Sequence, residues 1–239
     1  MVAIHQPHYF PWLGYLAKMA SVEKFILLDR VQLEKSSYMI RNRITDLDGN
    51  IKYLTISAEK HGFLEKEYRE IRTKEFAVYT DRQKNLICDA YKKSEYFDQI
   101  WNAIFPIFSE EHEFLCDATI HSINILREIF SINTPLVLQS DIEINDNVKR
   151  GKLVLELCKA VGADAYYAGR GASMEYLDLE EFEQEGVHVV YQNFCHPVYE
   201  QIGNHSFISG LSALDLLFNQ GIERSREIFW NSVESSRYI

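Results

Sequence analysis

Cysteine is scarce in this sequence, and the few cysteines lie far apart. The 239 residues include four of them, none in a CxxC pair: Cys88, Cys116, Cys158 and Cys195. Such spacing is typical neither of a structural zinc site nor of a disulfide framework. We therefore expect reduced thiols in the cytoplasm.

Long hydrophobic runs and an excess of positive charge are missing as well. No stretch approaches the roughly 18 apolar residues that a membrane span needs, and the N-terminus shows no basic segment followed by an apolar signal core. The 35 acidic residues outnumber the 25 Lys and Arg, and the formal net charge of −10 disfavours binding to nucleic acid. We expect a chain that is neither exported nor bound to a membrane.

Apolar material, by contrast, is ample. Hydrophobic residues make up 46% of the sequence and aromatic residues 13%, which is enough for a sizeable core and disfavours extended disorder. We predict a single α/β domain over residues 1–239.

Short apolar runs that alternate with helical patterns predict a mainly parallel sheet. The runs at 2–4 and 25–28 flank a segment rich in helix formers at 12–19, which predicts a βαβ unit with parallel strands. Further strands are predicted at 134–138, 165–168 and 187–191, and further helices at 145–161, 175–185 and 212–219. The polar tail from 231 to 239 should be frayed.

Two segments interrupt this alternation. Asp48, Gly49 and Asn50 form a turn signal between two β-rich runs and predict a hairpin. Residues 64 to about 130 show apolar spacing with the helical period and predict an insertion of three or four helices. The predicted fold is therefore a mainly parallel, Rossmann-like α/β sheet with a β-hairpin and a helical insertion.

His5 and His8 stand where the first predicted strand gives way to a helix. In open α/β sheets, ligands and phosphates bind at this carboxyl edge. No Cys, Asp or Glu nearby completes a metal-ligand set, so we assign no metal. One imidazole could merely satisfy the backbone of the turn; the alternative that we favour is stabilisation of negative charge on a transferring group.

Trp12 and Gly14 begin the helix that follows the histidines. Packing would account for the tryptophan as well as ligand contact would. A glycine inside a helix costs roughly 1 kcal/mol relative to alanine, so Gly14 predicts the close approach of a ligand or of a neighbouring strand.

A second glycine-bearing turn, YYAGRGAS, follows the strand predicted at 165–168. Its Gly169, Arg170 and Gly171 would lie at the same sheet edge as the histidines, although glycine pairs close many turns without a ligand. Lys149 and Arg150, predicted in the first turn of the preceding helix, would oppose the helix dipole unless an anion lies near. We expect both groups to contact an anionic substrate.

The segment DRVQLEKSSYMIRNRI follows the second predicted strand. Asp29 and Gln32 leave the sheet at the same edge as the histidines, and Arg41 and Arg43 can each hold a phosphate or carboxylate through two parallel hydrogen bonds. A solvated loop would carry such charges without any ligand. We predict an anion clamp.

His196, Tyr199 and Asp215 lie in the last part of the chain. Asp215 follows Ser212 in an arrangement that fits a helix N-cap, a purely structural use of both residues. The cap and a contact with substrate stay open as alternatives.

Four separated blocks of the sequence resemble the WbqC-like family in the expected order. They are IHQPHYFPWLGYLAKMA, DRVQLEKSSYMIRNRI, YYAGRGASMEYL, and HPVYEQ with LSALDLLFNQG. Members of this family occur in bacterial surface-polysaccharide gene clusters, and the resemblance implies the addition of an amino-acid or acyl group to an amino sugar. The sequence departs from the family around 36–40, where the family has more basic and aromatic character.

A fold-level resemblance extends to the HxGH nucleotidylyltransferases and class I aminoacyl-tRNA synthetases, which share a HUP-like sheet. In that group a strand, a histidine-bearing turn and a helix bind ATP phosphates. PHYFPWLGYL is similar in layout, but Tyr15 stands where the second histidine would be. This resemblance implies ATP with Mg as cofactor, whereas the residues themselves fix none.

We therefore expect an enzyme that joins a carboxylate, such as glycine, to the amine of a nucleotide-linked amino sugar. His5 and His8 would steady the developing anion, and Asp29 would orient or deprotonate the amine. The donor would be an acid activated by ATP or a pre-charged aminoacyl-tRNA. A nucleotidylyltransferase and a non-catalytic nucleotide- or sugar-binding protein are the alternatives, and the oligomeric state is open.

The other residues of the predicted site would bind the donor, the sugar or its phosphates. They are Gln6, Tyr9, Trp12, Gly14, Gln32, Lys35, Arg41, Asn42, Arg43, Lys149, Arg150, Gly169, Arg170, Gly171, His196, Tyr199 and Asp215.

Overall fold

A computed structural model describes residues 1–33, 37–59, 61–145, 148–171 and 173–236. Lys35, one of the predicted binding residues, lies outside the described residues, as does Ser36. None of the described helices combines the length and the apolar character that crossing a bilayer requires.

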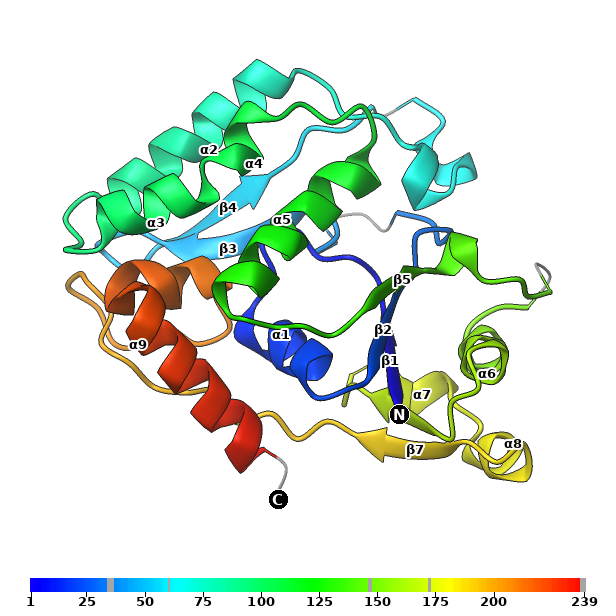
Figure 1. Ribbon diagram of the computed structural model, residues 1–239. Helices are drawn as coiled ribbons and strands as arrows, with labels where there is room; N and C mark the ends of the chain where they lie inside the picture. Colours follow the sequence, from blue (N-terminus) through cyan, green and yellow to red (C-terminus); the bar gives the residue numbers. More distant parts are fainter. Residues whose placement is uncertain (34–36, 60, 146–147, 172, 237–239) are drawn as a thin grey trace.

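A five-stranded sheet forms the centre of the molecule, and all its neighbouring strands are parallel (Figure 1). In spatial order it contains β5 (Leu136–Leu138), β2 (Lys24–Leu27), β1 (Val2–His5), β6 (Ala165–Ala168) and β7 (His188–Tyr191). Together with a separate two-stranded hairpin, this is the mixed α/β fold with a mainly parallel sheet that the sequence predicted.

The strand order reverses direction beside β1. The chain first moves from β1 through β2 to β5 on one side, and then returns past β1 to place β6 and β7 on the other side. Where the connections from two neighbouring parallel strands run toward opposite sides of the sheet, a crevice forms outside the carboxyl ends of those strands. Here that crevice lies between the ends of β1 and β6.

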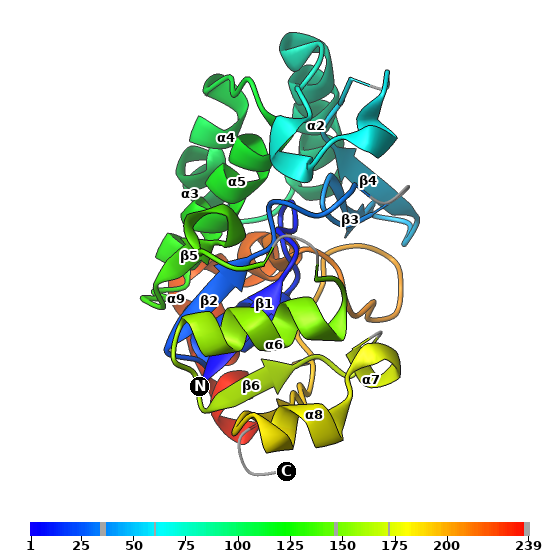
Figure 2. The same cartoon turned by 90° about the vertical axis from the view of Figure 1, so that its right-hand side faces the viewer.

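Alternation along the strands gives each face of the sheet its own core. Ala3 and Phe25 face a large cluster that includes α1 (Leu13–Ala20) and α9 (Ala213–Ser235). Val2 and Ile26 face a smaller cluster with α6 (Gly151–Ala160) and α8 (Leu179–Gln184). Helices thus cover both faces, as a buried parallel sheet requires (Figure 2).

The hairpin and the helical insertion lie between β2 and β5 in the chain and form the upper part of Figure 1. The hairpin consists of β3 (Arg41–Thr45) and β4 (Ile51–Thr55), and the Asp46 carboxylate accepts hydrogen bonds from the backbone of its turn. The insertion contains two short 3-10 helices, η1 (Phe63–Glu65) and η2 (Tyr68–Glu70), and then α2 (Phe76–Tyr91), α3 (Phe97–Ile104), α4 (Pro106–Ser109) and α5 (Leu115–Ile129). A third 3-10 helix, η3 (Gln139–Asp141), follows β5.

Three predicted helices have different bounds in the structure. The helix predicted at 145–161 begins only at Gly151, because Arg150 has a positive φ of 54° that no helix contains. Lys149 and Arg150 therefore precede the first turn rather than forming it.

The helix predicted at 175–185 is two helices, α7 (Ser173–Tyr176) and α8, because Asp178 accepts a hydrogen bond from the Glu181 amide and starts a new helix. The helix predicted at 212–219 continues past a break at Gly221 to Ser235, so the predicted fraying from 231 was wrong over the described residues. Phe229 and Val233 are buried in the large core and hold this last helix in place.

Candidate functional site

The crevice between β1 and β6 holds two adjoining cavities of about 380 and 320 Å³. Both are lined by His5, Lys18, Gly169 and Gly171. The first also reaches the start of α1 through Trp12, Gly14 and Tyr15, the turn after β6 through Arg170, and the end of β7 through Gln192. The second reaches α7 and includes Gln6, Ser173 and Tyr176. The structure therefore brings residues 5–18 and 166–194 together at the reversal point of the sheet.

Two histidines and a tyrosine cluster at the end of β1. The ring centroids of His5 and His8 are 4.6 Å apart, and Tyr15 stacks on His8 at 4.9 Å and meets the edge of His5 at 5.1 Å. The Tyr15 hydroxyl donates to the carbonyl oxygen of Gln6. The tyrosine that replaces the second histidine of the HxGH layout thus packs directly on both imidazoles.

Both imidazoles are neutral at physiological pH. Burial, reinforced by the positive charge of Lys18, lowers the pKa of His5 to about 3. Burial also holds the pKa of His8 well below its usual range, with smaller effects of His5 and Lys18. His5 Nδ1 lies 3.0 Å from the carbonyl oxygen of Gln6, which can only accept, so Nδ1 carries the proton and Nε2 presents a lone pair.

Lys18 is a residue of this crevice that the sequence analysis missed. Its side chain is buried, and Nζ donates to the carbonyl oxygen of Ile4 at 3.3 Å and lies 5.7 Å from the centre of the Tyr166 ring. Burial lowers the pKa of Lys18 to about 7. Its position in the helix could have indicated a place in the site, because Lys18 stands one turn after Gly14 and Tyr15 and therefore lies on the same helix face.

Neither the backbone conformation nor steric crowding explains why the turn after β6 contains two glycines. Neither Gly169 nor Gly171 has a positive φ, and a Cβ atom at either position would meet no described atom within 4 Å. Glycine in such a position leaves backbone amides open to a close-lying group. Arg170 lies between them and lines the first cavity.

Trp12 closes one side of the crevice by lying on Gly14. A Cβ atom at Gly14 would come 2.2 Å from Cη2 of the indole, so this glycine is required by Trp12 itself. The indole lies parallel to the His196 ring, at a centroid distance of 6.5 Å. His196 therefore stands behind the tryptophan and does not line either cavity, and burial lowers its pKa.

Asp29 does not line the crevice. Only 1% of the residue is exposed, and its Oδ1 accepts the backbone amide of Ser140 at 3.0 Å, which ties the end of β2 to η3. His8 likewise lies behind the cavity lining, and its Nδ1 has no hydrogen-bond partner among the described residues.

The hairpin residues make hydrogen bonds within the fold. Asn42 is fully buried, donates to the carbonyl oxygen of Tyr9, and accepts the amide of Arg43. The Tyr9 hydroxyl donates to Gln83. Arg43 Nη2 donates to the carbonyl oxygen of Gly210 at 2.8 Å, and the Arg41 guanidinium lies 4.4 Å from the centre of the Tyr53 ring.

Asp215 and Tyr199 belong to a buried hydrogen-bond network. The Asp215 carboxylate accepts from the hydroxyls of Tyr91 and Tyr199 and from the side-chain amide of Gln201. Ser212 caps α9 by accepting from the amide of Leu214, as the sequence suggested. The contacts of Asp215 thus join α2, α9 and the segment that precedes α9.

A third hollow lies at the carboxyl ends of β2 and β5. It has a volume of about 390 Å³ and is lined by Gln32, Lys149 and Arg150, together with Arg30 and Lys66. It lies apart from the crevice, because the two share no lining residue.

Comparison with known proteins places the chain in a family. An uncharacterized protein of Mycobacterium tuberculosis, Rv1507c, is 29% identical over 224 residues, which cover 93% of this chain and 94% of the relative. No solved structure matches. The model of the WbqC-like protein family matches residues 6–227, which include the hairpin, the buried Asp215 network and the lining of the crevice apart from Ile4 and His5. The chain therefore belongs to the WbqC-like protein family.

Proposed function

We propose that this protein is an amide-forming acyl or aminoacyl transferase that acts on a nucleotide-linked amino sugar in bacterial surface-polysaccharide biosynthesis. The observation that carries the proposal is the buried Lys18, whose pKa is about 7, beside the neutral His5 in the crevice between β1 and β6.

An amine acceptor makes a particular demand on its site. It attacks only as the free base, and it must lose a further proton as the amide bond forms. A base whose pKa lies near the working pH serves best for this proton transfer. Lys18 meets that condition, and we assign the proton-accepting role to it rather than to the buried Asp29.

His5 supplies a second neutral group in the same cavities. Its Nε2 lone pair can accept a hydrogen bond from the acceptor amine and so orient the amine toward the acyl carbon. Tyr15 holds the turn at Gln6 and packs against the imidazole, which limits the rotation of the ring.

The nucleotide end of the acceptor is anionic, and the β6 turn provides suitable partners. Arg170 can hold a phosphate through two hydrogen bonds, and the space beside Gly169 and Gly171 lets a phosphate come close to the backbone. Arg41 remains a candidate for a further phosphate contact. The donor is an acid activated by ATP with Mg²⁺, from which phosphate or AMP leaves as the amide forms, or an aminoacyl-tRNA, from which the tRNA leaves.

The test is direct assay of amide formation. Purified protein is incubated with UDP- or dTDP-linked amino sugars and with glycine plus ATP and Mg²⁺, or with glycyl-tRNA, and products are identified by mass spectrometry. We expect the amino sugar to gain the mass of the acyl group. The Lys18→Met variant should lose roughly a hundredfold or more in rate, whereas Lys159→Met, at an exposed helical lysine, should not.

Two results would replace the proposal with its alternatives. Pyrophosphate release from ATP or another nucleotide without any amine acceptor would indicate a nucleotidylyltransferase. Tight binding of nucleotide sugars with no turnover of any donor would indicate a non-catalytic binding protein.

A further inference from the structure

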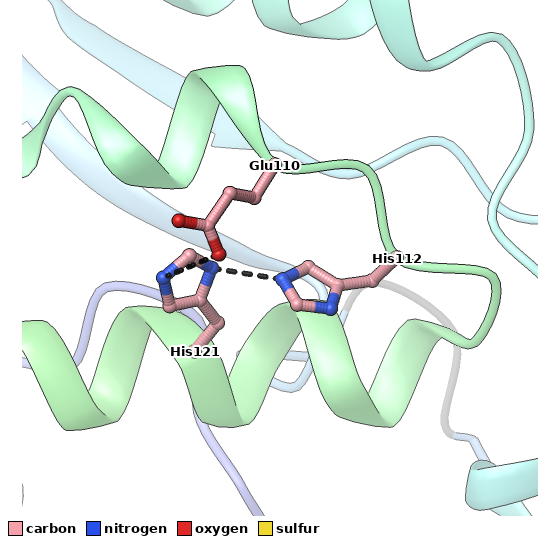
Figure 3. A group of neighbouring side chains, drawn as sticks. All are labelled: Glu110, His112 and His121. Atoms are coloured by element: carbon pink, nitrogen blue, oxygen red, sulfur yellow. Dashed lines mark hydrogen bonds and ion pairs between the residues drawn. The ribbon is translucent and has the colours of Figure 1, made fainter.

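Glu110, His112 and His121 form a second cluster of reactive side chains, in the helical insertion (Figure 3). Glu110 follows α4, His112 lies in the loop that leads to α5, and His121 lies on α5 itself. None of the three lines the β1–β6 crevice. The cluster is therefore independent of the proposed transferase activity.

The donor atoms of the cluster converge. One ligand atom from each residue can be chosen such that all three lie within 4.8 Å of one another. His112 Nε2 faces His121 Nδ1 at 2.8 Å, and a Glu110 carboxylate oxygen lies 3.7 Å from the other nitrogen of His121. Two ligands of one tetrahedral zinc ion stand roughly 3.3 Å apart. Small side-chain rotations would open the facing nitrogens to that spacing.

The backbone that carries these ligands is anchored on both sides. The amide of Thr73 donates to the carbonyl oxygen of Glu113, and its hydroxyl donates to the carbonyl oxygen of His112. The amide of Leu115 donates to the carbonyl oxygen of Ile71 at the start of α5. The cluster is also open to solvent, since the side chain of Glu110 is 60% exposed and that of His121 is 17% exposed.

We propose that Glu110, His112 and His121 bind a divalent transition-metal ion of the zinc class, with water in the fourth position. Two imidazole nitrogens with one carboxylate oxygen favour such an ion over Mg²⁺ or Ca²⁺, which prefer oxygen ligands. Without metal, the two facing nitrogens share a hydrogen bond. With metal, both present lone pairs to the ion, and the donating imidazole carries its proton on its outer nitrogen.

The site should tie the α4–α5 loop to α5. Because a bound ion stabilises only the folded chain, the melting temperature should rise with ion concentration.

The experiment measures metal affinity directly. Protein without a histidine tag is stripped with a chelator and then titrated with Zn²⁺ by calorimetry and with Co²⁺ by visible absorption. We expect one ion per chain, a tetrahedral or five-coordinate Co²⁺ spectrum, and no heat on titration with Mg²⁺.

Variants assign the ligands. His112→Asn, His121→Asn and Glu110→Gln should each weaken Zn²⁺ binding by roughly a hundredfold or more, since even partners of metal ligands matter by about 10- to 100-fold. The matched control is His188→Asn, because His188 pairs with a single carboxylate, Glu183, on the surface. This control should bind Zn²⁺ as the wild type does.

A wild-type affinity no tighter than that of the double variant His112→Asn/His121→Asn would overturn the proposal and leave a hydrogen-bonded histidine pair only. An equal loss in His188→Asn would overturn it as well. Circular dichroism checks the folding of each variant; if His121→Asn does not fold, the two loop variants decide the outcome.

Discussion

At the scale of the residue, the cost of burying Lys18 bears on both stability and activity. Its pKa is about 7 in the folded chain against an ordinary value of 10.5. Between these values the unfolded chain binds more protons than the folded chain, so the free energy of unfolding rises as the pH rises through this window. At pH 7 most of the free-energy cost of burying the Lys18 amine is still present.

We predict that Lys18→Met raises the free energy of unfolding at pH 7 by about 1 to 3 kcal/mol, because methionine fills a similar volume without a charge to desolvate. The advantage over wild type should shrink at pH 10, because removing the proton from the wild-type lysine on folding costs much less free energy there. Urea denaturation at both pH values measures this. A variant that is more stable and yet inactive would mark Lys18 as functional, whereas a less stable variant would show that its hydrogen bond to Ile4 is structural.

The residues of the crevice could be predicted only in part. His5 and the glycine turn at 169–171 drew attention because they follow apolar strands directly. Lys18 did not, since a lysine in a helix ordinarily faces solvent and burial cannot be read from one side chain. Conversely, the sequence did not reveal the structural contacts of Asn42, Arg43 and Asp215, because their partners lie far away in the chain.

At the scale of the element, α1 shows how a helix start shapes the crevice. The Trp12 indole packs on Gly14. The carbonyl oxygen of Gly14 also accepts a hydrogen bond from the side-chain amide of Gln192, which follows β7. The first turn of this helix is therefore packed on both sides.

We predict that Gly14→Ala destabilises the fold by about 1 to 3 kcal/mol, because the added methyl group must displace the indole. In a Trp12→Ala background the same change should become neutral or stabilise by up to about 1 kcal/mol, through the better helix propensity of alanine. A double-mutant cycle from denaturation curves measures the coupling. Equal costs in both backgrounds would show that the clash is with something other than Trp12.

The hairpin offers a contrast between its two arginines. Arg43→Lys should lower the melting temperature, because lysine cannot reproduce the guanidinium contact with Gly210 that joins β3 to the segment before α9. Arg41→Lys keeps a cation beside the Tyr53 ring and should weaken nucleotide-sugar affinity by roughly tenfold if Arg41 holds a phosphate. Calorimetric titration at low and high salt checks the second part. Wild-type affinity in Arg41→Lys would remove Arg41 from the site.

Strands were predicted more closely than helices, for a physical reason. A strand buried on both faces is a continuous apolar run with clear ends, as at 165–168, which the structure reproduces as Ala165–Ala168. Helix ends depend on caps and on contacts distant in sequence. The start of α6 is an example, because it is set by the positive φ of Arg150, and the next residue, Gly151, lies so close to the carbonyl oxygen of Tyr176 that a side chain there would clash.

At the scale of the whole molecule, the burial of neutral histidines lowers the free energy of unfolding at acid pH. The folded pKa of His5 is about 3 and its ordinary value is 6.5. The unfolded chain binds the extra proton between these values, so the stability contributed by the neutral imidazole is complete above pH 6.5 and is lost as the pH falls toward 3.

We predict that the free energy of unfolding of the wild type falls more steeply than that of His5→Gln between pH 6 and pH 4. The difference in slope should correspond to about one proton per chain, or about 1.4 kcal/mol per pH unit. Urea denaturation at half-unit pH steps measures both curves, and the carboxylates common to both cancel in the difference. Parallel curves would mean that His5 is solvated enough to titrate normally.

The position of β1 at the centre of the sheet also affects the order in which the sheet can form during translation. Val2 pairs with Lys24, which follows it closely in the chain, on one side and with Tyr166, which is translated much later, on the other. The pairing with β2 can form early, but the other edge of β1 must wait for most of the chain to be translated. During that interval the nascent protein exposes an apolar central strand, which is the kind of surface that holding chaperones bind.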